Sequence, residues 1–365
     1  MRRTRGRVVH IESLEDLDRR LTAGATTLNG WRLHGLDLSG RVDQLLAHRV
    51  GGATFLGCRF ANGDVERVEA AGGLVLPAFS DVPVDAYRSR LYSADELYGA
   101  GPYPDSYDAR AYSWSQGRLD HDDLLAGVLH DHAIDDALAD WASTRRLVGV
   151  MGGHAVTRAD DLFRSAARLG HGLGATLTVA TGGGPGAMEA ANLGGLLAGQ
   201  PPEVLDEAVD LLGRAPSFRP SVDAWLAPAR QVLAGDVDAP CDTLGIPTWH
   251  YGHEPTNVFA TAIAKYLHNP TREAILLEVC DAGIVFLPGA AGTVQEVFQD
   301  ACENYYADES SLASMVLVGR TYWTETLPAW PLLRALAQGR PMQDRVHLVD
   351  SVEEATELMR GSGSA

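Results

Sequence analysis

Short apolar runs recur along the C-terminal part of the chain, with helical stretches between them. Each run is nearly unbroken rather than alternating with polar residues, which is typical of strands that are covered on both faces. Strands of this kind that alternate with helices predict a parallel sheet with crossover helices, and hence an α/β, Rossmann-like doubly wound core over residues 141–365. The expected strands are residues 147–151, 176–180, 243–249, 283–287, 315–318 and 346–349.

A helical insertion punctuated by prolines separates the second and third of these runs, over about residues 198–240. Two stretches within it, 204–212 and 222–233, have the pattern of helices. An insertion at this place could line or cap a ligand site, and a role in packing or in oligomer formation accounts for it equally well.

The first 140 residues have a different pattern. Short apolar runs such as 54–56 and 74–76 lie among many glycines and polar residues. A stretch rich in Tyr, Pro, Ser and Asp, residues 98–112, then leads into acidic helices between Asp120 and Trp141. We expect a separate small N-terminal α/β domain over residues 1–140, whose role the pattern does not indicate. No repeat is strong enough to predict a solenoid.

The composition of the chain limits the kinds of binding partner that we expect. The chain has 365 residues, with 30 basic against 48 acidic side chains and a formal net charge of −18. A surface that follows a nucleic-acid backbone needs an excess of Lys and Arg, so a nucleic-acid polymer is not expected. No stretch approaches the roughly 18–20 apolar residues that cross a bilayer, and the basic start runs into acidic residues rather than an apolar signal core. We therefore expect a cytoplasmic protein with no membrane partner.

Lysine and cysteine usage excludes several chemistries. Lys265 is the only lysine, so a P-loop lysine is absent and a lysine-dependent enzyme is disfavoured. It lies in residues 262–267, an apparently amphipathic stretch, where we expect a solvated position on a helix face. The four cysteines are widely spaced and form no CxxC pair, which removes the common zinc and redox patterns and favours buried free thiols.

A glycine-rich turn, residues 182–186, directly follows the second expected strand and precedes a helix. Gly183, Gly184 and Gly186 would let the backbone approach a phosphate, and the helix would offer unpaired amides at the positive end of its dipole. The same glycines could simply make a tight turn. The turn does not fit G-x-G-x-x-G, so a dinucleotide cofactor is not indicated.

A second glycine-containing turn, residues 288–296, follows the fourth expected strand. On one interpretation Thr293 is a helix N-cap and Glu296 completes a capping box with it. On the other, the amides of Gly292 and Thr293 bind phosphate, close to Gly289, and Glu296 is a charged site group. Ligands in such folds bind at the carboxyl ends of the strands, so two turns of this kind in one sheet favour a site.

Together, residues 182–186 and 288–296 resemble the signature of the LOG (Lonely guy) family, often misnamed lysine decarboxylases, whose motif is PGGxGTxxE. Residues 251–260, YGHEPTNVFA, are similar to the longer bacterial members, the pyrimidine/purine nucleotide 5′-monophosphate nucleosidases. The resemblance covers about residues 145–320. It implies hydrolysis of the N-glycosidic bond of nucleoside 5′-monophosphates to free base and ribose 5-phosphate. Ala290 stands where the family has its second motif glycine, and it could crowd the loop or set its conformation.

The resemblance places the family's catalytic arginine on Arg272 and its catalytic glutamate on Glu296. Cleavage of a ribosyl bond builds positive charge on the sugar, so an ionised carboxylate stabilises it and can deprotonate the attacking water. We expect the helix dipole to keep Glu296 ionised. Arg272 would clamp phosphate or ribose oxygens. Without the resemblance, Arg272 follows a helix start at residues 269–270 and could equally pair with a surface carboxylate.

Other residues are weaker candidates for the site than Arg272 and Glu296. Gly152, Gly153 and His154 follow the first expected strand, where a ligand-facing loop belongs, and His154 could be a base, a phosphate contact or a loop histidine bonded to backbone. Asn257 and Glu189 could meet ribose hydroxyls or the base, or bond to local backbone.

Two histidine clusters are less suited to metal than to other roles. His250 and His253, with Glu254, form an HxxH pattern that lacks the HExxH helix, so we expect no metal. Residues 130–132 and 135–136 lie in an acidic helix, where a solvated face is the simpler interpretation.

The sequence thus leads to one hypothesis and one rival. The hypothesis is a nucleoside 5′-monophosphate phosphoribohydrolase that needs no cofactor or metal and, by the family resemblance, forms a homodimer or higher homo-oligomer. The rival is a nucleotide-binding sensor or regulatory protein without chemistry. Base preference does not follow from the sequence.

Overall fold

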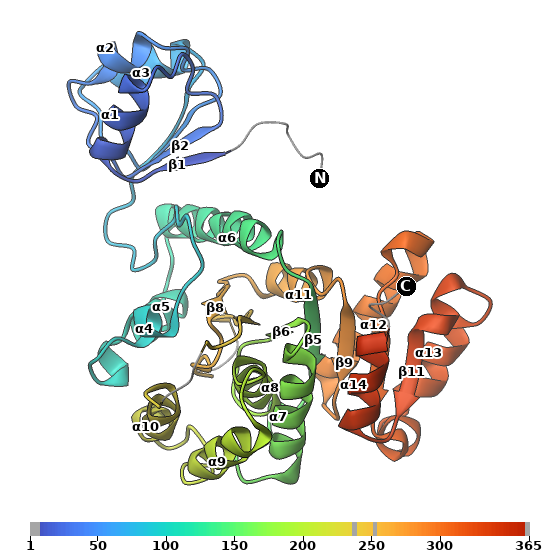
Figure 1. Ribbon diagram of the computed structural model, residues 1–365. Coiled ribbons are helices and arrows are strands. Elements are labelled where there is room, and N and C mark those ends of the chain that lie inside the picture. Colours follow the sequence, from blue (N-terminus) through green and yellow to red (C-terminus); the bar gives the residue numbers. More distant parts are fainter. Residues whose placement is uncertain (1–7, 236–238, 251–253, 362–365) are drawn as a thin grey trace. The chain divides into compact units, whose positions relative to one another are not determined.

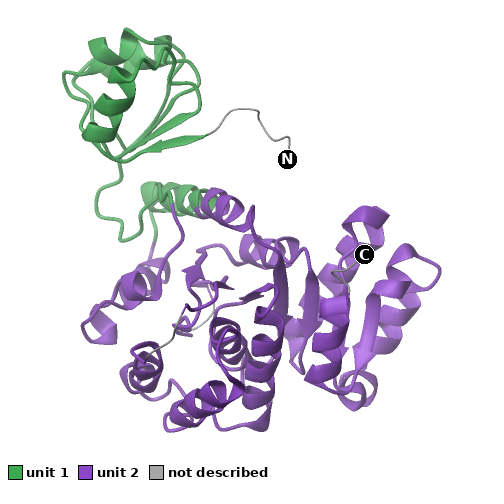
Figure 2. Ribbon diagram, in the orientation of Figure 1, with its two compact units in different colours: residues 1–89, 119–133 green, residues 90–118, 134–365 purple. Residues whose placement is uncertain are grey.

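The computed structural model describes residues 8–235, 239–250 and 254–361. The chain divides into two compact units, which Figure 2 distinguishes by colour. Unit 1 contains residues 1–89 and 119–133, and unit 2 contains residues 90–118 and 134–365. Residues 90–118 thus belong to unit 2, whereas the predicted boundary near residue 140 lies close to the end of helix α6 (His121–Ala142).

Unit 1 is a parallel four-stranded sheet in which the strands lie side by side in chain order, β1-β2-β3-β4. A helix follows each of the first three strands, so the unit is a β/α repeat (Figure 1). Registered partners lie 22 residues apart for Val9 and Trp31, and 20 apart for Thr54 and Leu74. The expected N-terminal α/β character is confirmed, but the structure contains a repeat that the sequence did not reveal. The elements are β1 (Val9–Ile11), α1 (Leu14–Thr22), β2 (Trp31–His34), α2 (Val42–Leu46), β3 (Thr54–Leu56), α3 (Asp64–Ala70) and β4 (Leu74–Leu76).

The repeat has its own apolar core. Ile11, Leu33 and Phe55 occupy inward positions of successive strands and are fully buried. Helices α1 and α3 contribute Leu17 and Val68 to the same core. Each β/α unit of the repeat buries its apolar side against its neighbours. The stacked units therefore form a core that no single unit could form.

Unit 2 is built on a seven-stranded, all-parallel sheet in the order β11-β10-β9-β5-β6-β7-β8. The predicted doubly wound fold is confirmed, with strands at all six expected runs and helices α9 and α10 in the insertion. The strands are β5 (Leu147–Met151), β6 (Thr178–Thr181), β7 (Thr243–Gly245), β8 (Ala262–Ile263), β9 (Gly283–Phe286), β10 (Met315–Val318) and β11 (Val346–Val349).

Helices precede the first strand of this sheet, link the later strands and follow the last one (Figure 1). They are α4 (Ala94–Tyr98), η1 (Tyr103–Asp105), α5 (Tyr107–Ser115), α7 (Asp161–Gly174), α8 (Ala187–Leu196), α9 (Pro202–Leu212), α10 (Val222–Leu233), α11 (Asn269–Glu278), α12 (Ala291–Tyr306), η2 (Glu309–Ser311), the π-helical turn η3 (Tyr322–Thr326), α13 (Ala329–Ala337), η4 (Pro341–Arg345) and α14 (Val352–Gly361). Within the described ranges, no helix combines the length and the apolar character that a bilayer-spanning helix needs.

The strand order fixes where a ligand can bind. Strand β5 comes first in this sheet along the chain, with β6 on one side and β9 on the other. The chain order therefore reverses between β5 and β9, and the loops that leave their carboxyl ends frame the crevice that such sheets use for ligands.

One predicted element is wrong. Residues 262–267 are not a helix: Ala262 and Ile263 form edge strand β8, and Lys265 is 1% exposed. Its Nζ donates to Asp108 Oδ1 at 2.5 Å and to Thr256 Oγ1 at 2.8 Å. A lone lysine among apolar residues gives the same sequence pattern whether it points to water or to a buried partner that lies far away in the chain.

The solvated face expected for residues 130–132 and 135–136 of α6 is wrong for His130 and Asp131, whereas His132 is exposed. His130 is fully buried and Asp131 is 5% exposed, with His130 Nδ1 and Asp131 Oδ1 2.9 Å apart. His130 falls four residues from Ala126 and from Ile134, which are also fully buried, so it lies on the buried face of this helix.

The cysteines match the sequence analysis in part. All four are free thiols; Cys58 and Cys280 are buried, Cys241 is half-buried and Cys302 is exposed. The expectation of buried thiols is therefore wrong for Cys302.

Candidate active site at the carboxyl edge of the sheet

Three loops meet where β5, β6 and β9 end. A Cβ atom on Gly152 would lie 2.5 Å from the carbonyl oxygen of Leu287, and one on Gly186 would lie 2.5 Å from that of Gly153. Side chains at these two positions would therefore displace backbone, and both glycines have positive φ, 100° and 78°. Gly289 also touches the first loop, because its Cβ would lie 3.1 Å from Gly152 Cα. The structure thus brings the predicted Gly152, Gly153, Gly186 and Gly289 to one edge of the sheet.

The loop after β9 opens into helix α12 without a side-chain cap. Ala290 is the N-cap residue and its side chain cannot accept a hydrogen bond, while Thr293 is already the third helical residue. The capping-box interpretation of Thr293 and Glu296 is therefore wrong. Ala290, Ala291 and Gly292 are exposed, and nothing lies within 4 Å of a Cβ on Gly292. The first amides of a helix have no intrahelical acceptor, so this exposed turn can receive an anion.

Ala290 lies outside the left-handed region of backbone conformation that favours glycine. Its φ of −92° is one that L-residues adopt, so glycine is not required there. The side chain is exposed and does not crowd the loop.

The glycine-rich turn after β6 is buried rather than open. Gly183 N–H donates to Thr181 Oγ1 at 3.0 Å, and Ala187 N–H donates to the carbonyl of Gly153 at 3.1 Å. Met188 lies over the turn, with its Sδ 2.8 Å from the place of a Cβ on Gly182. Gly183 and Gly184 thus belong to a closed turn, and some backbone N–H groups of this turn already have acceptors within the protein.

Arg272 extends from α11 onto this same turn. Its Nε donates to the carbonyl of Ile246 at 2.7 Å, and its Nη2 to that of Gly182 at 3.3 Å. Within the part of the chain that the structure describes, it forms no ion pair, so the alternative of a surface carboxylate partner is wrong. Its Nη1 has no hydrogen-bond partner among the described residues. The backbone thus fixes the plane of the guanidinium while part of its donors are available to a ligand.

Glu296 lies on the second turn of α12 and is half-buried, and its carboxyl group forms no hydrogen bond or ion pair with any described residue. Its pKa is raised to about 7, chiefly by burial; the charge of Arg272 lowers the pKa and that of Glu273 raises it. The expectation that the helix dipole keeps this carboxyl firmly ionised is therefore wrong. A carboxyl with a pKa near neutrality exchanges protons readily at physiological pH, as general acid–base chemistry requires.

Glu273 was missed by the sequence analysis. It accepts from Asn269 Nδ2 at 2.6 Å and from Gln295 Nε2 at 2.5 Å, so it ties α11 to α12 and fixes a negative charge close to Glu296. Its position beside Arg272 in the chain was the available signal. Tyr322 was missed too, and its hydroxyl donates to the carbonyl of Gly289 at 2.7 Å from η3.

Asn257 and Glu189 are fully buried and already bonded. Asn257 Nδ2 donates to the carbonyl of Gly184 at 3.1 Å and to Asn192 Oδ1 at 3.1 Å, so it holds the glycine-rich turn. Glu189 accepts from Arg158 Nε at 2.9 Å inside unit 2. The alternative of local backbone bonding holds for Asn257 Oδ1, which accepts from the N–H of Phe259 at 3.1 Å. Glu189 instead pairs with the side chain of Arg158, which neither alternative named.

The structure gives the histidine candidates no assigned role in the site. His154 and His250 are exposed, and His253 lies outside the described residues. Among the described residues, no group of His, Cys, Asp and Glu side chains could hold a metal ion.

The raised pKa of Glu296 gives a prediction about stability that needs no ligand. The folded chain holds this proton more tightly than the unfolded chain, so wild-type stability falls as pH rises from about 4.5 to about 7. Glutamine mimics the protonated form. We expect Glu296→Gln to have a Tm close to wild type at pH 4.5 and a higher one at pH 8, measured by thermal circular dichroism. Glu357→Gln, at an exposed position of α14, is the control. If the Tm of Glu296→Gln differed from that of the wild type by the same amount at every pH, the pKa of Glu296 would not be raised in the folded chain.

Comparison with known proteins adds the fold alone. No protein-family model matches the sequence, and no curated protein matches it at a significant level. The fold is similar to that of the molybdenum cofactor carrier protein from Chlamydomonas reinhardtii, with 17% identity over 60% of this chain and 99% of that one, at a TM-score of 0.39. It is similar also to the molybdenum cofactor binding protein from the phototrophic bacterium Rippkaea orientalis, with 19% identity, 60% and 96% coverage, and a TM-score of 0.37. Both scores are low, so they indicate nothing about ligand or activity. The strand order of unit 2 shows a Rossmann-like, doubly wound α/β fold.

Proposed function

We propose that the chain is a LOG-type phosphoribohydrolase, which hydrolyses the N-glycosidic bond of nucleoside 5′-monophosphates. One observation carries the proposal most: Glu296, half-buried and without a bonded partner among the described residues, lies within electrostatic reach of Arg272 beside an exposed helix N-terminus. The three features match what the reaction needs, namely a carboxylate for the sugar, a guanidinium for oxygens and amides for phosphate.

The chemistry divides among these groups. The phosphate binds at the first turn of α12, near Gly292 and Thr293, where the amides lack intrahelical acceptors. The free donors of Arg272 hold phosphate or ribose oxygens and fix the sugar. Glu296 stabilises the positive charge that develops on the sugar and takes a proton from the attacking water. The oxygen of this water forms the new bond to C1′ and the C–N bond breaks, with the bonding electrons going to the base. The base takes up one proton, which balances the proton that Glu296 takes from water and regenerates the carboxylate.

The direct test is release of free base. The purified protein is incubated with AMP, GMP, CMP, UMP or isopentenyladenosine monophosphate, and the products are separated by liquid chromatography. We expect free base and ribose 5-phosphate in equal amounts from at least one of them, without added metal. Base release that needs a divalent ion, or none from any substrate, would contradict the proposal.

Arg272 gives a second prediction. Arg272→Lys keeps the charge but loses the planar fork, so we expect KM to rise about tenfold or more. Arg272→Ala should lower kcat/KM further, by about 10²-fold or more. Both are measured by the base-release assay, with Arg168→Lys, an exposed residue of α7, as the control. Full turnover in Arg272→Ala would exclude it from the site.

A second candidate function is binding of a nucleotide without chemistry, as in a sensor. The β/α repeat of unit 1 favours it, because the catalytic proposal gives this unit no role. Calorimetry separates the two: tight nucleotide binding with no base released over hours favours the sensor, whereas base release excludes it.

A further inference from the structure

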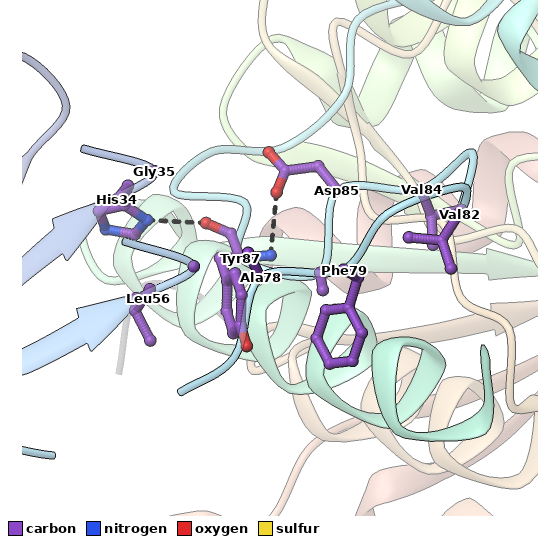
Figure 3. A pocket seen from close by; sticks show the side chains of 11 residues that line it. His34, Gly35, Leu56, Ala78, Phe79, Val82, Val84, Asp85 and Tyr87 are labelled. Carbon is purple, nitrogen blue, oxygen red and sulfur yellow. Dashed lines mark hydrogen bonds between the residues drawn. The ribbon is translucent and has the colours of Figure 1, made fainter. Parts of the chain in front are cut away.

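Unit 1 has a cavity of its own, separate from the site in unit 2. It has a volume of about 330 Å³ and lies where strands β2 and β3 end, at His34 and Leu56 (Figure 3). The segment after β4, residues 78–87, folds back to form its other wall. A Cβ on Gly57 would lie 3.2 Å from the ring of Tyr87, so this segment packs directly on the strand ends.

Three hydrogen bonds of Tyr87 hold this wall of the cavity in place. Its backbone N–H donates to Asp85 Oδ1 at 3.0 Å, and its carbonyl accepts from His34 Nδ1 at 2.8 Å. Its hydroxyl donates to the carbonyl of Pro77 at 2.7 Å. Figure 3 shows the first two of these bonds. A pocket whose wall is held in this way is preformed, which lowers the entropy lost on binding.

Two aromatic rings and one carboxylate set the chemistry of this cavity. The rings of Phe79 and Tyr87 have centroids 6.0 Å apart and planes inclined by 32°. Asp85 is exposed, and its Oδ2 has no hydrogen-bond partner among the described residues. Aromatic faces attract cations, and a carboxylate with an open oxygen accepts their hydrogen bonds.

The charged groups near the cavity also favour a cation as its ligand. Burial lowers the pKa of His34, so the imidazole in the wall is uncharged at neutral pH. Glu12 and Asp85 each act on His34 more strongly than the nearby cation Arg32 does. The charges around the cavity therefore favour a positive group over a negative one.

We propose that this cavity binds the guanidinium group of an arginine side chain, stacked on the rings of Phe79 and Tyr87 and hydrogen-bonded to Asp85. Guanidinium suits the cavity better than ammonium, because it is planar, stacks on aromatic faces and is less strongly hydrated. The arginine can belong to a small molecule or to a peptide, since the cavity recognises only the shared group. This proposal does not rest on the proposed function of unit 2.

The test is calorimetry or NMR titration of the full chain with N-acetyl-arginine amide. N-acetyl-citrulline amide, which has the same shape without the charge, and N-acetyl-lysine amide are the matched ligands. We expect arginine to bind with a Kd of about 1 mM, lysine more weakly and citrulline not measurably. A blocked Gly-Arg-Gly peptide forms the second arm: tighter binding than the single residue indicates a peptide ligand, and equal binding a small molecule.

Variants locate the binding. Asp85→Asn keeps an oxygen for the Tyr87 amide and removes the charge, so we expect affinity to fall about tenfold or more. Phe79→Leu should also weaken binding. Asp81→Asn is the control, because Asp81 is exposed in the same segment and does not line the cavity. Equal binding of citrulline, an equal loss in Asp81→Asn, or no arginine binding at about 10 mM would overturn the proposal, whatever the outcome of the base-release assay.

Discussion

Glu296→Gln is expected to lower kcat for base release by about 10³-fold or more, with KM changed only a few-fold. Glutamine has nearly the same shape and keeps an oxygen toward the sugar, but it can neither take a proton from water nor carry the charge that stabilises the transition state. Substrate binding through Arg272 and the first turn of α12 is left intact. The measurement is steady-state release of free base, together with nucleotide affinity by calorimetry.

Glu303→Gln is the matched control, since Glu303 lies two turns further along α12 at an exposed position. We expect it to retain activity. The pH profile supplies an independent check, because kcat/KM of the wild type should fall as pH drops below about 7 and Glu296 becomes protonated. Turnover of Glu296→Gln within tenfold of wild type would remove this carboxyl from the mechanism.

The sequence predicted the sheet of unit 2 well because its strands are continuous apolar runs that are buried on both faces. It also predicted that the two glycine-containing turns lie at one edge, because parallel strands place all their carboxyl ends together. Arg272 and Glu296 came from the family resemblance, and the structure adds the contacts that position Arg272 and the environment that raises the pKa of Glu296.

Other features depend on contacts between distant segments and could not be read from local pattern. Thr293 and Glu296 have the spacing of a capping box, yet the helix begins at Ala291 because the loop packs Thr293 against Gly289 and Gly152. The sequence gives little sign of the repeat in unit 1, because its β/α units share only a few apolar positions, among loops that are rich in glycine. Short strands of three or four residues give a weak periodic signal.

Lys265 and Asp108 illustrate the same limit and give the largest expected effect on stability. Both side chains are 1% exposed, 157 residues apart in the chain, and their charges are 2.5 Å apart. Asp108 also accepts from Trp249 Nε1 at 2.9 Å and from the Tyr103 hydroxyl at 3.0 Å. One carboxylate thus joins the segment around η1 and α5 to the edge of the sheet at β8.

Lys265→Met keeps the length of the side chain but leaves the Asp108 carboxylate buried without its counter-ion. We expect the free energy of unfolding to fall by about 3–5 kcal/mol, measured by urea denaturation followed by circular dichroism. The double variant Lys265→Met with Asp108→Asn removes both charges and keeps an oxygen that can accept from Trp249 Nε1, so it should recover part of this loss. Arg320→Met is the control, because it breaks an exposed ion pair with Asp350 and should change stability by less than about 1 kcal/mol. If the double variant is as unstable as the sum of the two single variants, the charges do not stabilise each other, and the buried pair acts through packing alone.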